Sequence, residues 1–221
     1  IENLPVRSAQ EQCSAWNSTP CIVADKEENG TIYALSPAAK RVGITTQMTQ
    51  TEAMHCCPLI ESIQPVNTPS TSLQKRIFEL LYEYTDLIEN VSDTAFYLDI
   101  TFDKLDIPIG FRTAQLVHSQ LRNELKLDAF VGLGPNKLLA LLASKTCTKS
   151  PIRAVDKNDT AAFLADLPID LLPGLGRTSR DRLRTLGIEC IGELAGVGLS
   201  DLRQHVGRSA LRLHQYAQGI D

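Results

Sequence analysis

The order of helical and strand patterns in the middle of the chain restricts the folds open to it. Apolar residues recur at helical spacing from Leu73 to Ile88, and this predicts a helix that buries one face and ends by Asn90. Later elements follow without long gaps: a strand at 92–101, a helix at 111–126, a strand at 129–133 and a helix at 138–144. Helices that alternate with strands in this way predict an α/β or α+β domain whose sheet is covered by helices.

The flanking segments have their own patterns. Two short strands at 20–24 and 31–35 are separated by a charged turn that ends at Gly30, which predicts a hairpin. A short helical segment with Lys40 follows, and the polar stretch 64–70, with Pro65 and Pro69, reads as a linker. From Thr160 onward the pattern is helical with glycine-containing turns. The chain therefore divides into a mixed part and an all-helical end.

The most specific local motif lies in the helical end, at Leu172-Pro173-Gly174-Leu175-Gly176. It predicts a helix-hairpin-helix, in which a Gly-x-Gly turn exposes backbone N–H groups at the start of the next helix. Such groups suit a DNA phosphate. The candidate contacts are Gly174, Gly176, Arg177, Thr178 and Arg180. The alternative is a glycine-rich turn between two packing helices, with the arginines on a solvated face.

Composition limits the classes of function. The net charge of −4 gives no global electrostatic attraction to nucleic acid, so DNA affinity must come from a local basic surface. The six cysteines lack a C-x2-C pair and the four histidines are widely separated, which argues against zinc. No apolar run approaches a membrane span and no signal-peptide pattern opens the chain. We therefore expect a cytoplasmic protein that does not enter a membrane.

These motifs together resemble the Y-family (translesion, UmuC/DinB-like) DNA polymerases over nearly the whole chain. The resemblance rests on Leu98-Asp99-Ile100-Thr101, on the turn at Gly134-Pro135-Asn136-Lys137 and on the hairpin at Gly174. It implies an α+β fold: a ferredoxin-like palm, a small fingers subdomain and an all-helical thumb with the helix-hairpin-helix. The expected ranges are 1–30 and 71–160 for the palm, 31–70 for the fingers and 161–221 for the thumb. The further C-terminal DNA-gripping (little-finger) domain of the family is expected to be missing from this fragment.

The same resemblance places the family's metal-binding Asp-Glu pair at Thr94 and Ala95, where no carboxylate is available. A one-residue bulge would instead bring Asp93 into place, leaving at best one ligand. Asp99 is expected to serve in hydrogen bonding at the strand end.

Two further family positions have lost their nucleotide-binding groups. A tyrosine that touches the nucleotide corresponds to Pro37, and a lysine that faces the triphosphate corresponds to Leu141. Lys40 and Lys137 remain as phosphate-facing candidates. Their alternative roles are a solvated helix face for Lys40 and a helix start for Lys137.

Three hypotheses follow. The first is a non-catalytic protein most similar to the ImuB-type members, which binds damaged DNA and acts as an adapter in translesion synthesis and SOS mutagenesis. The second is an active translesion polymerase with a rebuilt metal site using Asp93, and the third is a helix-hairpin-helix interaction module on a scaffold. No cofactor is expected for the first hypothesis, and Mg2+ for the second. The implied partners are primer–template DNA and, through regions outside this chain, a replicative-type polymerase, a RecA-like protein and a sliding clamp.

Overall fold

The computed structural model describes residues 1, 4, 6, 19–25, 30–64, 71–92, 94–101 and 107–221, with the backbone alone at 71, 72 and 107. The chain divides into two compact units. The first comprises Ile1–Phe102 and Leu116–Ala129, and the second comprises Asp103–Gln115 and Phe130–Asp221. None of the helices in these described residues combines the length and the apolarity that a membrane crossing requires.

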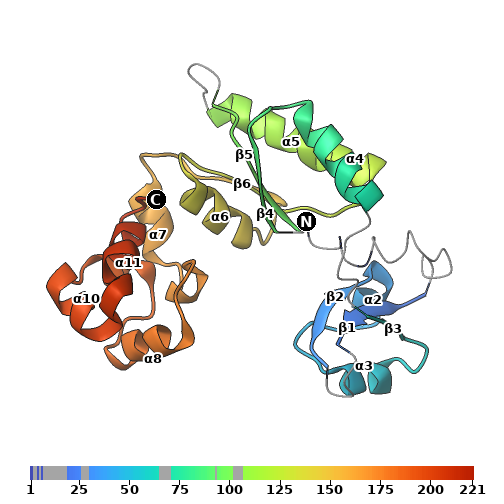
Figure 1. Ribbon diagram of the computed structural model, residues 1–221, viewed down its shortest axis with the longest axis horizontal. Coiled ribbons are helices and arrows are strands. Elements are labelled where there is room, and N and C mark those ends of the chain that lie inside the picture. The colour runs from blue at the N-terminus through green and yellow to red at the C-terminus, as the bar shows by residue number, and fades with distance from the viewer. Residues whose placement is uncertain are drawn as a thin grey trace. The chain divides into compact units, whose positions relative to one another are not determined.

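Strands and helices mix in the first unit and in the start of the second, which confirms the α+β class (Figure 1). The strands are β1 (Cys21–Ala24), β2 (Ile32–Leu35), β3 (Glu61–Ile63), β4 (Ile88–Ser92), β5 (Ala95–Leu98), β6 (Val131–Leu133) and β7 (Ile152–Ala154). The helices are α2 (Pro37–Arg41), α3 (Gln50–Cys56), α4 (Thr71–Tyr82), α5 (Ile107–Glu124), α6 (Lys137–Lys145), α7 (Thr160–Ala165), α8 (Arg177–Thr185), α9 (Ile191–Ala195), α10 (Leu199–Val206) and α11 (Ala210–Ala217). Two 3-10 turns, η2 (Ile169–Leu171) and η3 (Gly207–Ser209), lie in the helical end.

The first sheet has the order β2-β1-β3 and carries α2 and α3. β1 pairs antiparallel with β2 and parallel with β3, and all four of its side chains are buried. This arrangement confirms the pairing of the two predicted short strands, although the turn residues 26–29 lie outside the described residues. The sheet also crosses the limit that we placed between residues 30 and 31, because β1 and β2 share hydrogen bonds.

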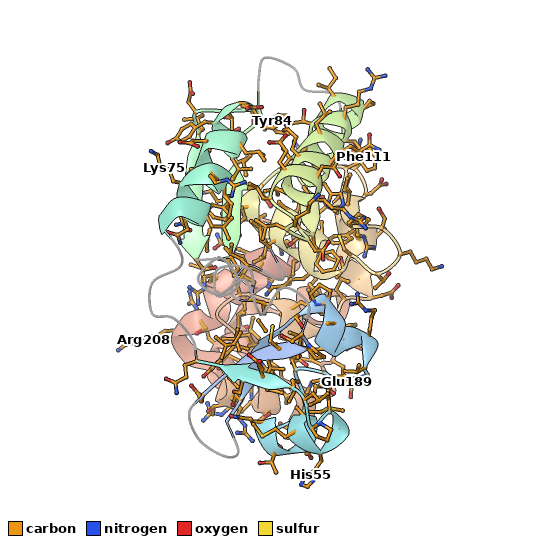
Figure 2. All side chains as sticks on the ribbon, turned by 90° about the vertical axis from the view of Figure 1, so that its right-hand side faces the viewer. His55, Lys75, Tyr84, Phe111, Glu189 and Arg208 are labelled. Atoms are coloured by element: carbon orange, nitrogen blue, oxygen red, sulfur yellow. The ribbon has the colours of Figure 1, made fainter. Side chains whose placement is uncertain are left out.

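The β4–β5 hairpin packs beneath α4 and α5 (Figure 1). Phe96 of β5 meets Phe78 of α4 edge-on, with ring centroids 5.4 Å apart, a geometry that adds to the stabilisation from buried area. Tyr84 lies between the two helices (Figure 2), where its hydroxyl donates a hydrogen bond to Gln120 Oε1. The hydrophobic core of this part is formed by one face of each helix and one face of the hairpin.

Two of the predicted elements here were wrong in extent. The first helix ends at Tyr82 rather than near Asn90, and Leu87 is 65% exposed. The Thr85 hydroxyl accepts from Leu87 N and donates to the Asp99 carbonyl, so the backbone turns into β4 instead of continuing the helix. The expected single strand at 92–101 is interrupted between β4 and β5. Leu116 of α5 is 57% exposed.

In the second unit, β6 and β7 pair in parallel and α6 packs against them. α6 lies so close to β6 that position 132 requires glycine. A Cβ at Gly132 would collide with the carbonyl oxygen of Ala140 and with the nitrogen of Ser144, both in α6. The helical end then forms one core from α6 to α11, with Leu183, Ile191, Leu194 and Leu213 all fully buried. The predicted strand at 129–133 and the predicted helix at 138–144 are confirmed with small shifts of their ends.

Candidate nucleic-acid interface

The β4–β5 hairpin leaves one face uncovered by α4 and α5. Phe96 and Leu98 pack into the core, so alternation along β5 directs Ala95 and Tyr97 to the opposite face. Glu89 pairs directly with Tyr97 across the ladder, and Val91 on β4 is 53% exposed. The predicted positions Thr94 and Ala95 therefore lie at the turn end of the hairpin, with Ala95 on its open face.

The described residues of this face do not fit a pair of Mg2+ ions. Such a site needs several carboxylates converging on the metals. Thr94 offers a hydroxyl and a backbone carbonyl, and that carbonyl accepts a hydrogen bond from Ile1 N at 2.5 Å. Ala95 offers no ligand, and Asp93 lies outside the described residues. Across the described part of the chain, no cluster of three His, Cys, Asp or Glu side chains could hold a metal.

The remaining candidates from the expected palm and fingers lie on other elements. Asp99 Oδ1 accepts a hydrogen bond from Thr101 N at 2.9 Å, so its predicted role at the strand end is confirmed. Lys40 is exposed in the last turn of α2, where Pro37 is the first residue and Ser36 is the N-cap. Pro37 has no hydrogen-bonding group on its side chain. Nothing in this helix therefore replaces the hydroxyl of a tyrosine.

The start of α6 is already capped from within the protein. Asn136 Oδ1 accepts from Leu139 N at 2.9 Å, and Asp221 Oδ2 accepts from Leu138 N at 3.0 Å. The Asn136 side chain also donates to the Gly219 carbonyl at 2.8 Å. Asn136 is thus the N-cap of α6, and Lys137 is exposed beside it. Because two backbone N–H groups have carboxylate or amide partners, the start of α6 is poorly suited to a phosphate.

The predicted helix-hairpin-helix is formed by η2, the turn at 172–176 and α8. Gly174 adopts φ +74°, a left-handed conformation that favours glycine. Gly176 is the N-cap of α8 and has no side chain that could satisfy the N–H groups of the first turn. Arg177 and Thr178 are exposed there. The turn thus presents unsatisfied N–H groups at the positive end of a helix, the arrangement that binds phosphate.

Arg180 has a different partner from the one its position suggested. Its Nε lies 2.8 Å from Asp170 Oδ1, and Arg184 Nη2 lies 2.6 Å from Asp170 Oδ2. Asp170 is in η2, so one carboxylate joins the turn before the hairpin to two successive turns of α8. Arg180 therefore shares one carboxylate with Arg184, whereas Arg177 forms no ion pair among the described residues.

We expect Asp170→Ala to lower the free energy of unfolding by about 1 kcal/mol, because three partly exposed charges lose a shared contact. The loss should shrink as salt is raised, since solvent-accessible pairs are screened. Chemical denaturation at two salt concentrations measures it. Asp181→Ala, which removes an exposed carboxylate from α8 itself, is the matched control. Equal losses in the two variants would contradict the assigned role of Asp170.

Sequence reasoning missed Asp170, Asp221 and Arg212 as parts of this region. The i, i+4 spacing of Arg180 and Arg184 signals that both lie on one helix face, but not that Asp170 meets them. Asp221 is 83 residues from Leu138, and Arg212 is 38 positions from the Gly174 turn it approaches. No local sequence pattern predicts either contact.

The fold and these sites define a protein class. The α+β arrangement with its helical end is the fold that the Y-family DNA polymerases share in their palm, fingers and thumb. The chain belongs to the impB/mucB/samB family, whose model matches residues 6–145, and residues 170–221 match the model described as the DNA polymerase-iota thumb domain.

Curated relatives and solved structures agree with this assignment. The chain is 31% identical over 195 residues to DNA polymerase IV of Ralstonia nicotianae, covering 88% of the chain and 55% of the relative. It is 33% identical over 211 residues to DNA polymerase IV 1 of Bacillus subtilis, covering 93% and 50%. The chain thus spans about half the length of these relatives.

The structure of DinB from Sulfolobus solfataricus superposes with a TM-score of 0.80 at 23% identity, over 99% of this chain and 65% of that one. An insertion ternary complex of Dbh DNA polymerase superposes with a TM-score of 0.83 at the same identity and the same coverage. At this level of identity these two structures support the fold alone.

Proposed function

We propose that this chain is the core of a non-catalytic Y-family protein of DNA damage bypass. It binds primer–template DNA through its helix-hairpin-helix. The observation that carries the proposal is the presence of Thr94 and Ala95 at the family's metal positions on a paired β4–β5 hairpin, whose register shifts between Asn90 and Ser92. The palm scaffold has kept its packing while losing carboxylates. Such a surface can still bind DNA. It cannot support phosphoryl transfer well, because that reaction depends on electrostatic stabilisation by metal-bound carboxylates.

Three separate losses support the non-catalytic role. The carboxylate pair, a nucleotide-contacting tyrosine at Pro37 and a triphosphate-facing lysine at Leu141 are each replaced by a residue without the required group. In the family these groups serve metal binding, contact with the nucleotide and contact with the triphosphate, respectively. One loss could be compensated locally, but three from different elements leave little of the apparatus.

The helix-hairpin-helix supports the proposed DNA binding. Gly176 leaves the first turn of α8 uncapped, and Arg177 and Thr178 are exposed beside it. These groups contact the phosphate backbone irrespective of base sequence. Relatives of the chain carry the name DNA polymerase IV. Lys40 and Lys137 are proposed as weaker phosphate contacts.

The finer assignment is an ImuB-type adapter in translesion synthesis and SOS mutagenesis, located in the cytoplasm. Its partners would be a replicative-type polymerase, a RecA-like protein and a sliding clamp, reached through regions outside this chain. We propose the ranges 1–30 and 71–160 as palm, 31–70 as fingers and 161–221 as thumb. The β1–β2 ladder favours moving the first limit so that β1 joins the fingers.

Binding of a fluorescent primer–template duplex, followed by anisotropy over a salt series, tests this function. Arg177→Glu should weaken binding at least about tenfold at 0.1 M salt, because one phosphate contact is lost and a negative charge is introduced. The double variant Lys40→Ala plus Lys137→Ala should weaken it less. If the double variant has no effect while Arg177→Glu abolishes binding, the hairpin alone is the interface. No salt-dependent binding by the unmodified chain would refute the proposal.

A further inference from the structure

A cation from the last helix of the chain lies against the hairpin turn. A Cβ at Gly174 would collide with Nη2 of Arg212, a residue of α11. The contact depends on the missing side chain at position 174, since the guanidinium occupies the space that a Cβ would take. Gly174 therefore has two functions: it adopts φ +74° in the turn, and it admits Arg212 to the turn.

Arg212 keeps its charge available at this position. It is exposed, and it forms no ion pair with a carboxylate in the part of the chain that the structure describes. Its Cζ lies 6.0 Å from the centroid of the Tyr216 ring, one helical turn away on α11. Contact with an aromatic face and with the turn restricts the guanidinium without neutralising it.

The arginines near the hairpin thus fall into two groups. Arg180 and Arg184 both pair with Asp170, so these three groups together keep a single net positive charge. Arg177 and Arg212 have no such partner among the described residues, and they come from two different helices beside the same Gly174–Gly176 turn. The positive charge of this turn is therefore supplied by a residue next to it in sequence and by a residue near the end of the chain.

We propose that Arg212 is a phosphate-binding residue of the hairpin, acting beside the N–H groups at the start of α8. The inference rests on the proposed DNA binding and adds to it a residue that the hairpin motif does not contain. A guanidinium donates charge-assisted hydrogen bonds to phosphate in a fixed fork geometry. The N–H groups alone would offer neutral donors, so Arg212 adds one full charge to the site.

The test is the affinity of the 221-residue chain for a fluorescent duplex, measured from 0.05 to 0.5 M NaCl. Loss of one phosphate contact lowers the slope of log K against log salt by about 0.9. Arg212→Ala should therefore show that smaller slope and bind about eightfold more weakly at 0.1 M than the unmodified chain. Arg212→Lys keeps the charge and should retain most of the slope. Lys75→Ala, which removes an exposed cation from α4 (Figure 2), should leave the slope unchanged.

A pair of glycine variants tests the role of position 174. Gly174→Ala and Gly187→Ala both place a side chain at φ near +75°, but only the former meets Arg212, because nothing lies within 4 Å of a Cβ at Gly187. Both should lower the thermal midpoint, and only Gly174→Ala should weaken DNA binding. Gly174→Ala combined with Arg212→Ala should bind no worse than Arg212→Ala alone.

Three results would count against the inference, and they are distinct. If the unmodified chain binds with a steep salt dependence and Arg212→Ala has the same slope and affinity, Arg212 is not a phosphate contact and the proposed function stands. If the unmodified chain does not bind duplex DNA at 0.05 M salt, the proposed function fails and the role of Arg212 fails with it. A lower thermal midpoint in Arg212→Ala with an unchanged slope would assign the residue a purely structural role.

Discussion

Primer extension by this chain in Mg2+ or Mn2+ is expected to remain at background, at least about 10³-fold below that of an active family member. The reason is the donor set. By the family resemblance, Thr94 and Ala95 correspond to the carboxylate pair that would hold metal, and Pro37 and Leu141 to two further substrate contacts. A gel assay of nucleotide incorporation on a primed template measures the rate directly.

The same preparation must bind the primer–template, so that inactivity is not a failure of folding. DNA polymerase IV 1 of Bacillus subtilis, a relative at 33% identity, serves as the comparison enzyme. Robust extension that disappears in Asp93→Ala would overturn the non-catalytic assignment, because it would mean that the metal site has been rebuilt around that carboxylate. Extension that survives Asp93→Ala would point to a contaminating polymerase and would call for repurification.

Gly132→Ala is expected to have the largest effect on stability, about 3 kcal/mol or more, with failure to fold as the extreme. The added Cβ would collide with the carbonyl oxygen of Ala140 and the nitrogen of Ser144. Both are backbone atoms inside α6, so relief requires the whole helix to move away from β6. That movement would also disturb Leu139 and Leu142, which are buried in the core of the second unit. Urea denaturation followed by circular dichroism gives the loss.

Gly176→Ala is the matched control for Gly132→Ala. Gly176 has φ −68°, which any residue adopts, and nothing lies within 4 Å of an added Cβ. Its free energy of unfolding should fall by no more than about 1 kcal/mol, because Ala is a poorer N-cap residue than Gly. A similar small change for Gly132→Ala would show that α6 can shift away from β6 at little cost, contrary to the close packing described above.

Much of the fold was predictable because it follows from short-range patterns. The helices at α4, α5 and α6 and the hairpin turn at Gly174 follow from periodicity and from glycine position. The ends were harder to place. The apolar spacing continued past Tyr82 into Leu87 and Ile88, and only the hydrogen bonds of Thr85 show where the helix gives way to β4. A periodic pattern does not reveal its own end when the next strand begins with apolar residues.

The candidate sites show the same difference between short-range patterns and long-range contacts. The sequence by itself determined the family resemblance, the helix-hairpin-helix and the absence of carboxylates at Thr94 and Ala95, because each depends on the identity of residues close together in the chain. The tertiary structure decided which cations remain unpaired at the proposed DNA-binding surface. Asp170 pairs with Arg180 and Arg184, Asp221 caps α6, and α11 carries Arg212 to the Gly174 turn. These are contacts between distant residues, and only the packing of the helices brings them together.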